Sequence, residues 1–169
     1  MTRREQLQFV VRGCTEKDLP TVIGINEIAL PEHYPRFFYE SILAKYPAAF
    51  LVAATVDPQS PEKEKLVGYI MWRLERGISE FGIRVVRKGH LVSLAVLEGY
   101  RRQGVATALL RKGMEEIAKY GAQEFVLEVR VSNLAAINLY RNVFHFEVKK
   151  VIEDYYRDGE NAYYMAYRP

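Results

Sequence analysis

The first half of the chain combines strand-like and helix-like patterns of apolar residues. Apolar side chains occupy every second position in 7–11, which predicts a first strand. Apolar residues recur at helical spacing in 19–30 and predict a helix that Pro31 ends. A second helix is expected between Pro35 and Pro47, because proline suits the first turn of a helix and cannot continue one.

Two β-rich runs, 49–56 and 66–74, follow the predicted helices. The stretch between them, 57–65, is polar, contains two prolines and is too short to separate domains. We therefore interpret it as a hairpin loop that joins an antiparallel pair of strands. Residues 75–88 show no clear period and are basic, so an irregular segment is expected there.

The second half of the chain has a strand–helix–strand pattern. The apolar run 90–96 predicts a short strand, beginning at His90, that is buried on both faces. A helix with one apolar face follows, 125–131 alternate as another strand, and 133–143 predict a further helix before two last strands. A crossover of this length joins parallel strands with a right-handed connection, so we predict an α/β fold with a mixed sheet.

Composition narrows the class of protein. The chain has 169 residues, 49% hydrophobic and 27% charged, which suits a single domain over 1–169. Lys and Arg number 24 against 21 Asp and Glu, a mild excess that favours an anionic ligand but is no nucleic-acid footprint. One cysteine, Cys14, excludes an internal disulfide and a cysteine zinc cage. Without a membrane-length apolar run or a signal-peptide core, a soluble, cytoplasmic protein is expected.

The turn after the first parallel strand carries the clearest chemistry. Residues 99–107 read Gly-Tyr-Arg-Arg-Gln-Gly-Val-Ala-Thr, between the end of a strand and the start of a helix. Free amides and the positive end of the helix dipole meet there, and Arg101 and Arg102 add two cations. Neither a Walker loop nor a dinucleotide fingerprint fits, since Gly104 is followed by no lysine and only one glycine is in place. Taken alone, the pattern is more often a structural turn with solvated arginines.

Ordered motifs along the chain resemble one acetyltransferase superfamily. The run Leu91-Val92-Ser93-Leu94-Ala95-Val96, followed by Tyr100-Arg101-Arg102-Gln103-Gly104-Val105-Ala106, resembles motif A of the GNAT acetyltransferases. Further matches are Leu30-Pro31-Glu32-x-Tyr34, Glu128-Val129-Arg130-x-Ser132-Asn133, Leu139-Tyr140 and the segment 155–163. Together they narrow the resemblance to the Ard1-type N-terminal acetyltransferases, the branch of NatA catalytic subunits and archaeal stand-alone enzymes, over roughly 9–168. This implies the GNAT fold, a mixed central sheet with helices on both faces.

The resemblance also implies acetyl-CoA as co-substrate, bound at the parallel strand–helix–strand unit. The loop would hold the pyrophosphate, the preceding strand would pair with the pantetheine arm, and a strand N–H near 94–96 would meet the thioester oxygen. Residues expected to bind the coenzyme are Leu94, Ala95, Val96, Arg101, Arg102, Gln103, Gly104, Val105, Ala106, Thr107, Asn133 and Tyr140.

Acetyl transfer to an α-amine needs only a weak base. With a pKa of ~8, on the order of one-tenth of such amines are neutral at pH 7, against about one lysine in several thousand. By the resemblance His90 and Glu128, on the two parallel strands, would remove the proton through a water, and Tyr140 would protonate the leaving thiolate. The alternatives are a structural His90, an ion pair of Glu128 with Arg130, and an adventitious metal, although two ligands make no zinc site.

Substrate selection falls to two loops in the resembling family. Leu30, Glu32 and Tyr34, with Tyr155 from a later loop, would form walls of a peptide groove, and the expected substrates begin with Ser, Ala, Thr, Gly or Met. Polypeptide N-termini are the expected partners, with the ribosome or an auxiliary subunit, and no nucleic acid, membrane or metal. Open alternatives are one ribosomal protein terminus, a lysine or a small amine as acceptor, and a non-catalytic module that binds acyl-CoA.

Overall fold

Two strands and one helix of this chain pass from one compact unit into another. The computed structural model describes residues 6–169, which form a unit ending at Trp72 and resuming over 93–116, and a second unit over 73–92 and 117–169. The elements that run through both are β3 (Leu66–Ile78), β4 (Val85–Val96) and α3 (Val105–Lys119). Hydrogen bonds order the strands β1-β2-β3-β4-β5-β7-β6.

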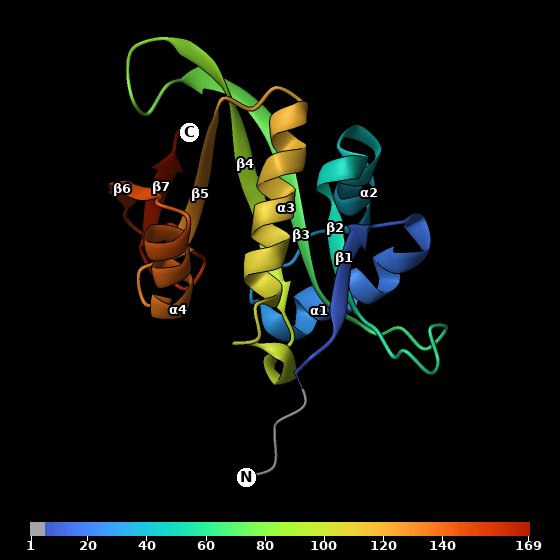
Figure 1. Ribbon diagram of the computed structural model, residues 1–169. Coiled ribbons are helices and arrows are strands. Elements are labelled where there is room, and N and C mark those ends of the chain that lie inside the picture. The colour runs from blue at the N-terminus through green and yellow to red at the C-terminus, as the bar shows by residue number, and fades with distance from the viewer. Residues whose placement is uncertain (1–5) are drawn as a thin grey trace. The chain divides into compact units, whose positions relative to one another are not determined.

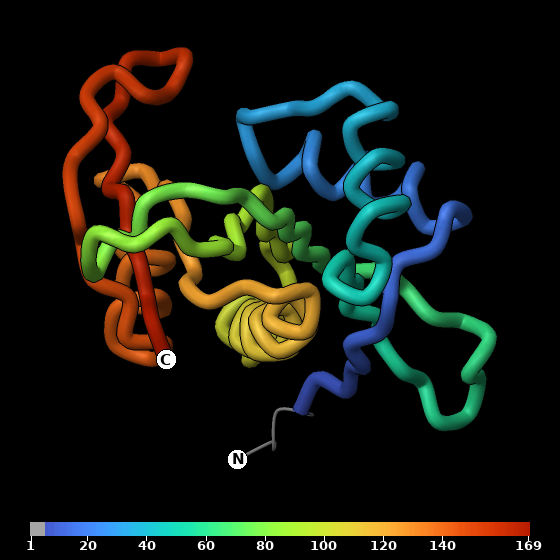
Figure 2. The backbone as a smooth tube through the Cα atoms, turned by 90° about the horizontal axis from the view of Figure 1, so that it is seen from above, coloured from blue at the N-terminus to red at the C-terminus, as the bar shows by residue number. Residues whose placement is uncertain are grey.

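The first unit contains the helices and strands of the first half of the chain (Figure 1). Helix α1 (Leu19–Ala29) has Pro20 in its first turn, and α2 (Arg36–Lys45) follows it. Strand β2 (Leu51–Thr55) pairs antiparallel with both β1 (Phe9–Gly13) and β3. The predicted hairpin loop between β2 and β3 is confirmed, and Figure 2 shows it projecting away from these strands.

The second unit holds the parallel pair of strands that the sequence pattern predicts. Strand β5 (Glu124–Arg130) runs parallel to β4, with Lys88 opposite Glu124 and His90 opposite Val126. On its other edge β5 pairs antiparallel with β7 (Ala162–Tyr167), which pairs with β6 (Glu147–Ile152). The α/β fold with a mixed sheet is thereby confirmed.

The expectation of an irregular segment over 75–88 was wrong. Strand β3 continues to Ile78 and β4 already begins at Val85, so the turn between them is short and His90 lies within its strand. A buried carboxylate holds this turn, since Glu124 accepts hydrogen bonds from the Ser79 hydroxyl and the Glu80 amide. Charged side chains that are hydrogen-bonded or paired in this way can lie in a strand. Such a strand lacks the apolar alternation by which strands are recognised in a sequence.

Two further predictions differ in detail from the structure. Strand β4 is not buried on both faces, because partly exposed and buried residues alternate over 90–95. The expected helix over 133–143 is a short α4 (Leu134–Asn138) continued by a π-helical turn, Leu139–Val143, which shifts the residues that follow around the helix axis. Beyond it, the Phe146 ring packs against Tyr140 and Tyr167, and Figure 1 shows α4 beside β6 and β7. Among residues 6–169, no helix has the length and apolar character that a bilayer crossing requires.

Helix α3 approaches β3 closely in the first unit because Gly113 has no side chain. A Cβ at this position would overlap the indole ring of Trp72, which is fully buried. Glycine weakens an exposed helix by ~1 kcal/mol relative to alanine, so its presence here reflects packing and not helix propensity.

We expect Gly113→Ala to destabilise the protein by roughly 1–3 kcal/mol, because the overlap with Trp72 outweighs the gain in helix propensity. The matched control is Gly24→Ala on α1, where a Cβ meets nothing within 4 Å and stability should rise by up to ~1 kcal/mol. Urea unfolding followed by circular dichroism measures both. Changes of the same sign at the two positions would contradict this account of the packing.

Candidate active site

The β4–α3 loop of the first unit carries main-chain amides that precede the hydrogen bonds of a helix. Helix α3 begins at Val105, and its first helical bond runs from the Ala108 amide to the Gly104 carbonyl oxygen, 3.0 Å away. The amides of 105–107 therefore precede the helical bonding pattern. Gly104 has φ +84°, a left-handed conformation that suits glycine, and a Cβ there would meet nothing within 4 Å. The loop thus combines donor groups with open space for an anion.

Two predicted coenzyme ligands of this loop have structural partners. Arg101 donates from Nε to the Val96 carbonyl oxygen at 2.9 Å, which fastens the loop to the end of β4. The Gln103 side chain donates to the Gly99 carbonyl oxygen at 3.4 Å. Arg102 is exposed, has φ +60° and makes no ion pair within the part of the chain that the structure describes. Arg102 therefore supplies a free positive charge at the loop.

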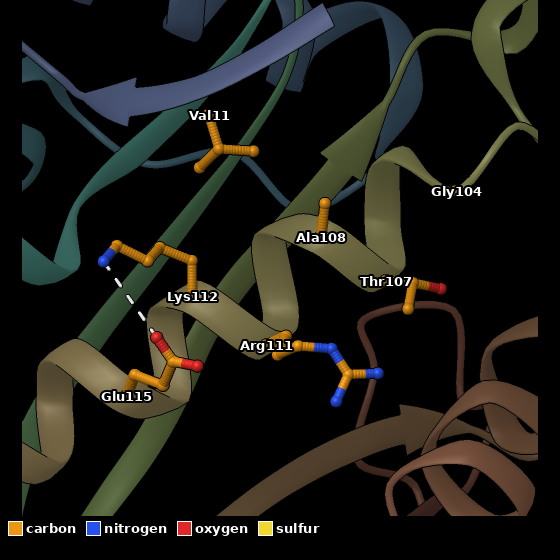
Figure 3. Close-up of a pocket in the computed structure, with 7 residues that line it drawn as sticks. All are labelled: Val11, Gly104, Thr107, Ala108, Arg111, Lys112 and Glu115. Atoms are coloured by element: carbon orange, nitrogen blue, oxygen red, sulfur yellow. Dashed lines mark ion pairs between the residues drawn. The ribbon is translucent and has the colours of Figure 1, made fainter.

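A pocket of about 490 Å³ lies along the first turns of α3 (Figure 3). Its lining residues come from α3, the preceding loop and strand β1, and they are Val11, Gly104, Thr107, Ala108, Arg111, Lys112 and Glu115. Lys112 pairs with Glu116 at 3.1 Å and, more distantly, with Glu115, whereas Arg111 points in another direction from the helix. The pocket adjoins the predicted anion loop at Gly104.

In the second unit the predicted pair of His90 and Glu128 is brought together. His90 Nε2 lies 2.6 Å from Glu128 Oε2, with the two residues on the parallel strands β4 and β5. The partner of Glu128 is thus His90, whereas Arg130 pairs with Asp158 and Glu160. Both side chains of the pair are largely buried, His90 being 14% and Glu128 15% exposed.

A third residue, which the sequence analysis missed, completes this cluster. Glu75 Oε1 on β3 lies 2.8 Å from His90 Nδ1, and it also accepts from Arg73 Nε at 2.8 Å. Glu75 falls in the segment that was expected to be irregular. If the strand predicted over 66–74 had been extended to 78, Glu75 would have been placed beside β4. Among residues 6–169, no group of three His, Cys, Asp or Glu side chains is arranged to hold a metal ion.

The two carboxylates determine the charge of the histidine. Burial alone lowers the pKa of His90, but the hydrogen bonds and charges of Glu128 and Glu75 outweigh it and raise that pKa above its ordinary 6.5. Burial raises the pKa of Glu75, yet its hydrogen bond to His90 and the charges of His90 and Arg73 bring it below its ordinary value. The carboxylates at the two ring nitrogens therefore favour the protonated form of His90, in which both nitrogens donate.

The predicted contributors from the later helix also lie in the second unit. Asn133 caps α4, its Oδ1 accepting from the Ala136 amide at 3.2 Å. Tyr140 lies in the π-helical turn and is buried, and its burial raises the pKa of its hydroxyl. The phenol is therefore protonated at neutral pH.

The expected peptide-binding residues divide between the two units. Leu30, Glu32 and Tyr34 lie in the α1–α2 loop of the first unit, where the Tyr34 ring stacks on Phe38 with centroids 4.8 Å apart. Tyr155 lies in the β6–β7 turn of the second unit, is 46% exposed and packs edge-on against Tyr156.

Residues 19–146 match the acetyltransferase (GNAT) family. This chain belongs to that family. It is 48% identical over 162 residues to an N-alpha-acetyltransferase of Sulfurisphaera tokodaii, covering 94% of this chain and 92% of the relative. It is 34% identical to the N-terminal acetyltransferase A complex catalytic subunit ard1 of Schizosaccharomyces pombe, covering 92% and 82% of the two chains. The crystal structure of Ard1 from Thermoplasma volcanium superposes with a TM-score of 0.76 at 25% identity, covering 96% of this chain and 98% of that one. The resemblance to GNAT enzymes of the Ard1 type is thus confirmed.

We expect an NMR titration of the His90 imidazole to give a pKa above 6.5 in the folded protein. Because this pKa is raised, the interaction of His90 with the two carboxylates stabilises the fold fully below about pH 6.5. This stabilisation is lost as the pH rises through the pKa of His90 in the folded protein. Glu128→Gln and Glu75→Gln should each lower the His90 pKa, since each removes one adjacent negative charge. A His90 pKa that neither variant moves would contradict the assigned hydrogen bonds.

Proposed function

We propose that this GNAT enzyme transfers the acetyl group of acetyl-CoA to the free α-amino group of polypeptides. The observation that carries the proposal is the Glu128 carboxylate, hydrogen-bonded to His90 on the adjacent parallel strand. A carboxylate is a weak base, sufficient for an α-amine with a pKa of ~8 but poorly suited to a lysine with a pKa of ~10.4. The 48% identical relative, named N-alpha-acetyltransferase, supports the same acceptor.

Acetyl-CoA would bind through the β4–α3 loop. The amides of 105–107 and the Arg102 cation suit its diphosphate, and the open space at Gly104 lets the phosphates approach the main chain. Arg101 and Gln103 would shape this loop through their bonds to main-chain carbonyls. Main-chain groups of 94–96 would pair with the pantetheine arm, and Asn133 would add a contact from α4.

In the proposed reaction the amine nitrogen attacks the thioester carbonyl carbon within a ternary complex. Glu128 accepts the amine proton through a water, while the His90 imidazolium holds the carboxylate in place. A strand amide near 94–96 stabilises the negative charge on the carbonyl oxygen. The C–S bond then breaks, and the coenzyme thiolate takes a proton from Tyr140. The products are the acetylated amide and free coenzyme A.

The acceptors are proposed to be polypeptide chains that start with Ser, Ala, Thr, Gly or Met. Leu30, Glu32, Tyr34 and Tyr155 would contact their first residues. We also propose that the enzyme acts in the cytoplasm, on the ribosome or together with an auxiliary subunit. The similarity to the S. pombe catalytic subunit supports a partner subunit.

One assay separates this function from the alternatives. The protein is incubated with acetyl-CoA and with peptides that differ only in the first residue, each also supplied with a blocked α-amine and a free internal lysine. We expect acetylation of the free α-amines, located by tandem mass spectrometry. Modification of lysine alone would contradict the proposal. Coenzyme binding without release of free thiol would identify a non-catalytic module instead.

For Glu128→Gln we expect kcat to fall by roughly 10²–10⁴-fold, the range of general-base contributions, with an unchanged Kd for acetyl-CoA. The amide retains the shape of the carboxylate but cannot accept a proton. Glu153→Gln, at an exposed position of the β6–β7 turn, is the matched control and should behave as wild type. Steady-state thiol release and calorimetric titration give the two constants. Wild-type turnover in Glu128→Gln would remove Glu128 from the base role.

The loop assignment makes a separate prediction at Gly104. Alanine at φ +84° is disfavoured by about 1–2 kcal/mol, so the loop should relax and turn its amides away from the coenzyme. We expect Gly104→Ala to raise the KM for acetyl-CoA roughly tenfold, the factor that corresponds to about 1.4 kcal/mol. Gly99→Ala is the control in the same loop, since Gly99 has no positive φ and equal space. Equal KM values for the two variants would contradict the assignment.

A further inference from the structure

A buried chain of polar side chains crosses the first unit. Asn26 in the last turn of α1 is 1% exposed, and its Nδ2 donates to the Glu32 carbonyl oxygen and to the Tyr69 hydroxyl, each at 3.0 Å. The Tyr69 hydroxyl on β3 lies 2.7 Å from Ser93 Oγ on β4. The chain thus runs from the α1–α2 loop through β3 to β4.

The hydrogen bonds of Asn26 have a fixed direction. The Glu32 carbonyl oxygen can only accept, so the amide group of Asn26 must face it with its nitrogen. The same nitrogen donates to the Tyr69 hydroxyl oxygen, and either hydroxyl can donate in the bond between Tyr69 and Ser93. The bonds together orient the groups along the chain.

This arrangement stabilises the core less than apolar side chains would. Asn26 Oδ1 is buried with no hydrogen-bond partner within residues 6–169, and an unsatisfied buried amide oxygen destabilises the fold. An apolar side chain of similar size would avoid that cost. What Asn26 provides in return is a fixed position for the loop that contains Glu32.

Both ends of the chain meet segments that the proposed function uses. The α1–α2 loop carries Leu30, Glu32 and Tyr34, and Asn26 holds it at the Glu32 main chain. At the other end, Ser93 immediately precedes the 94–96 segment assigned to the coenzyme. The hydrogen bonds therefore link the peptide loop to the coenzyme strand within one compact unit.

We infer that Asn26, Tyr69 and Ser93 are positioning residues that set the place of the peptide-binding loop relative to strand β4 and thereby determine the affinity for the acceptor peptide. This inference rests on the proposed function, because it needs the α1–α2 loop to bind the substrate. It concerns residues that do not themselves touch the reacting atoms.

The test removes one hydroxyl from the buried chain and compares the result with a buried apolar change. Tyr69→Phe breaks the chain, whereas Ile70→Val is a control at the next position of β3, fully buried and with no polar atom in its side chain. We expect Tyr69→Phe to raise the peptide KM five- to tenfold, with the acetyl-CoA KM and kcat changed less than twofold. All three constants should stay within twofold of wild type in Ile70→Val.

The split between constants separates positioning from a purely structural role. Loss of folding stability alone would lower the active fraction, and so the apparent kcat, without moving the peptide KM. If Tyr69→Phe does not fold, Ser93→Ala removes the hydroxyl at the other end of the chain and should also raise the peptide KM. An unchanged peptide KM in the folded variant would overturn the inference, whereas a wild-type enzyme that acetylates no α-amine would overturn the proposed function itself.

Discussion

The hydrogen bond between His90 and Glu128 depends on a feature that only the tertiary fold provides. The two residues are 38 positions apart, and the parallel pairing of β4 with β5 places them within 2.6 Å. Because Glu75 approaches the other ring nitrogen, the imidazole lies between two carboxylates that favour its protonated form. The proposed chemistry of the second unit follows from this arrangement, in which the cation orients a carboxylate and leaves it as the base.

The first unit contributes a different kind of constraint, the main-chain geometry of its loops. Gly104 gives the β4–α3 loop its left-handed turn, and Arg101 fastens that loop to the end of β4. Buried hydrogen bonds from Asn26 hold the α1–α2 loop. In both loops a hydrogen-bonded side chain holds the main chain, and this main chain carries the groups that would meet coenzyme or peptide.

Much of this fold could be predicted from the sequence, because its strand–helix–strand core has strong apolar periods. The same periods placed His90 and Glu128 on the two parallel strands, whereas their shared role was suggested by the resemblance to the acetyltransferase family. Glu75 was not accessible, because the end of its strand carries charged side chains, such as the ion pair of Arg73 with Glu75, and shows no apolar alternation. Without Glu75, the charge of His90 could not be inferred either. The hydrogen bond of Arg101 to the Val96 carbonyl could not be predicted either. A sequence does not distinguish a loop arginine that donates to a carbonyl from one that binds phosphate.

The measurement that most directly tests this account is the pH dependence of acetyl transfer to a free α-amine, compared between wild type and Glu75→Gln. If the His90 imidazolium orients Glu128, removing the Glu75 charge lowers the His90 pKa, and activity should decline at a lower pH than in wild type. Identical pH profiles for the two proteins would show that the charge of His90 plays no part in the reaction.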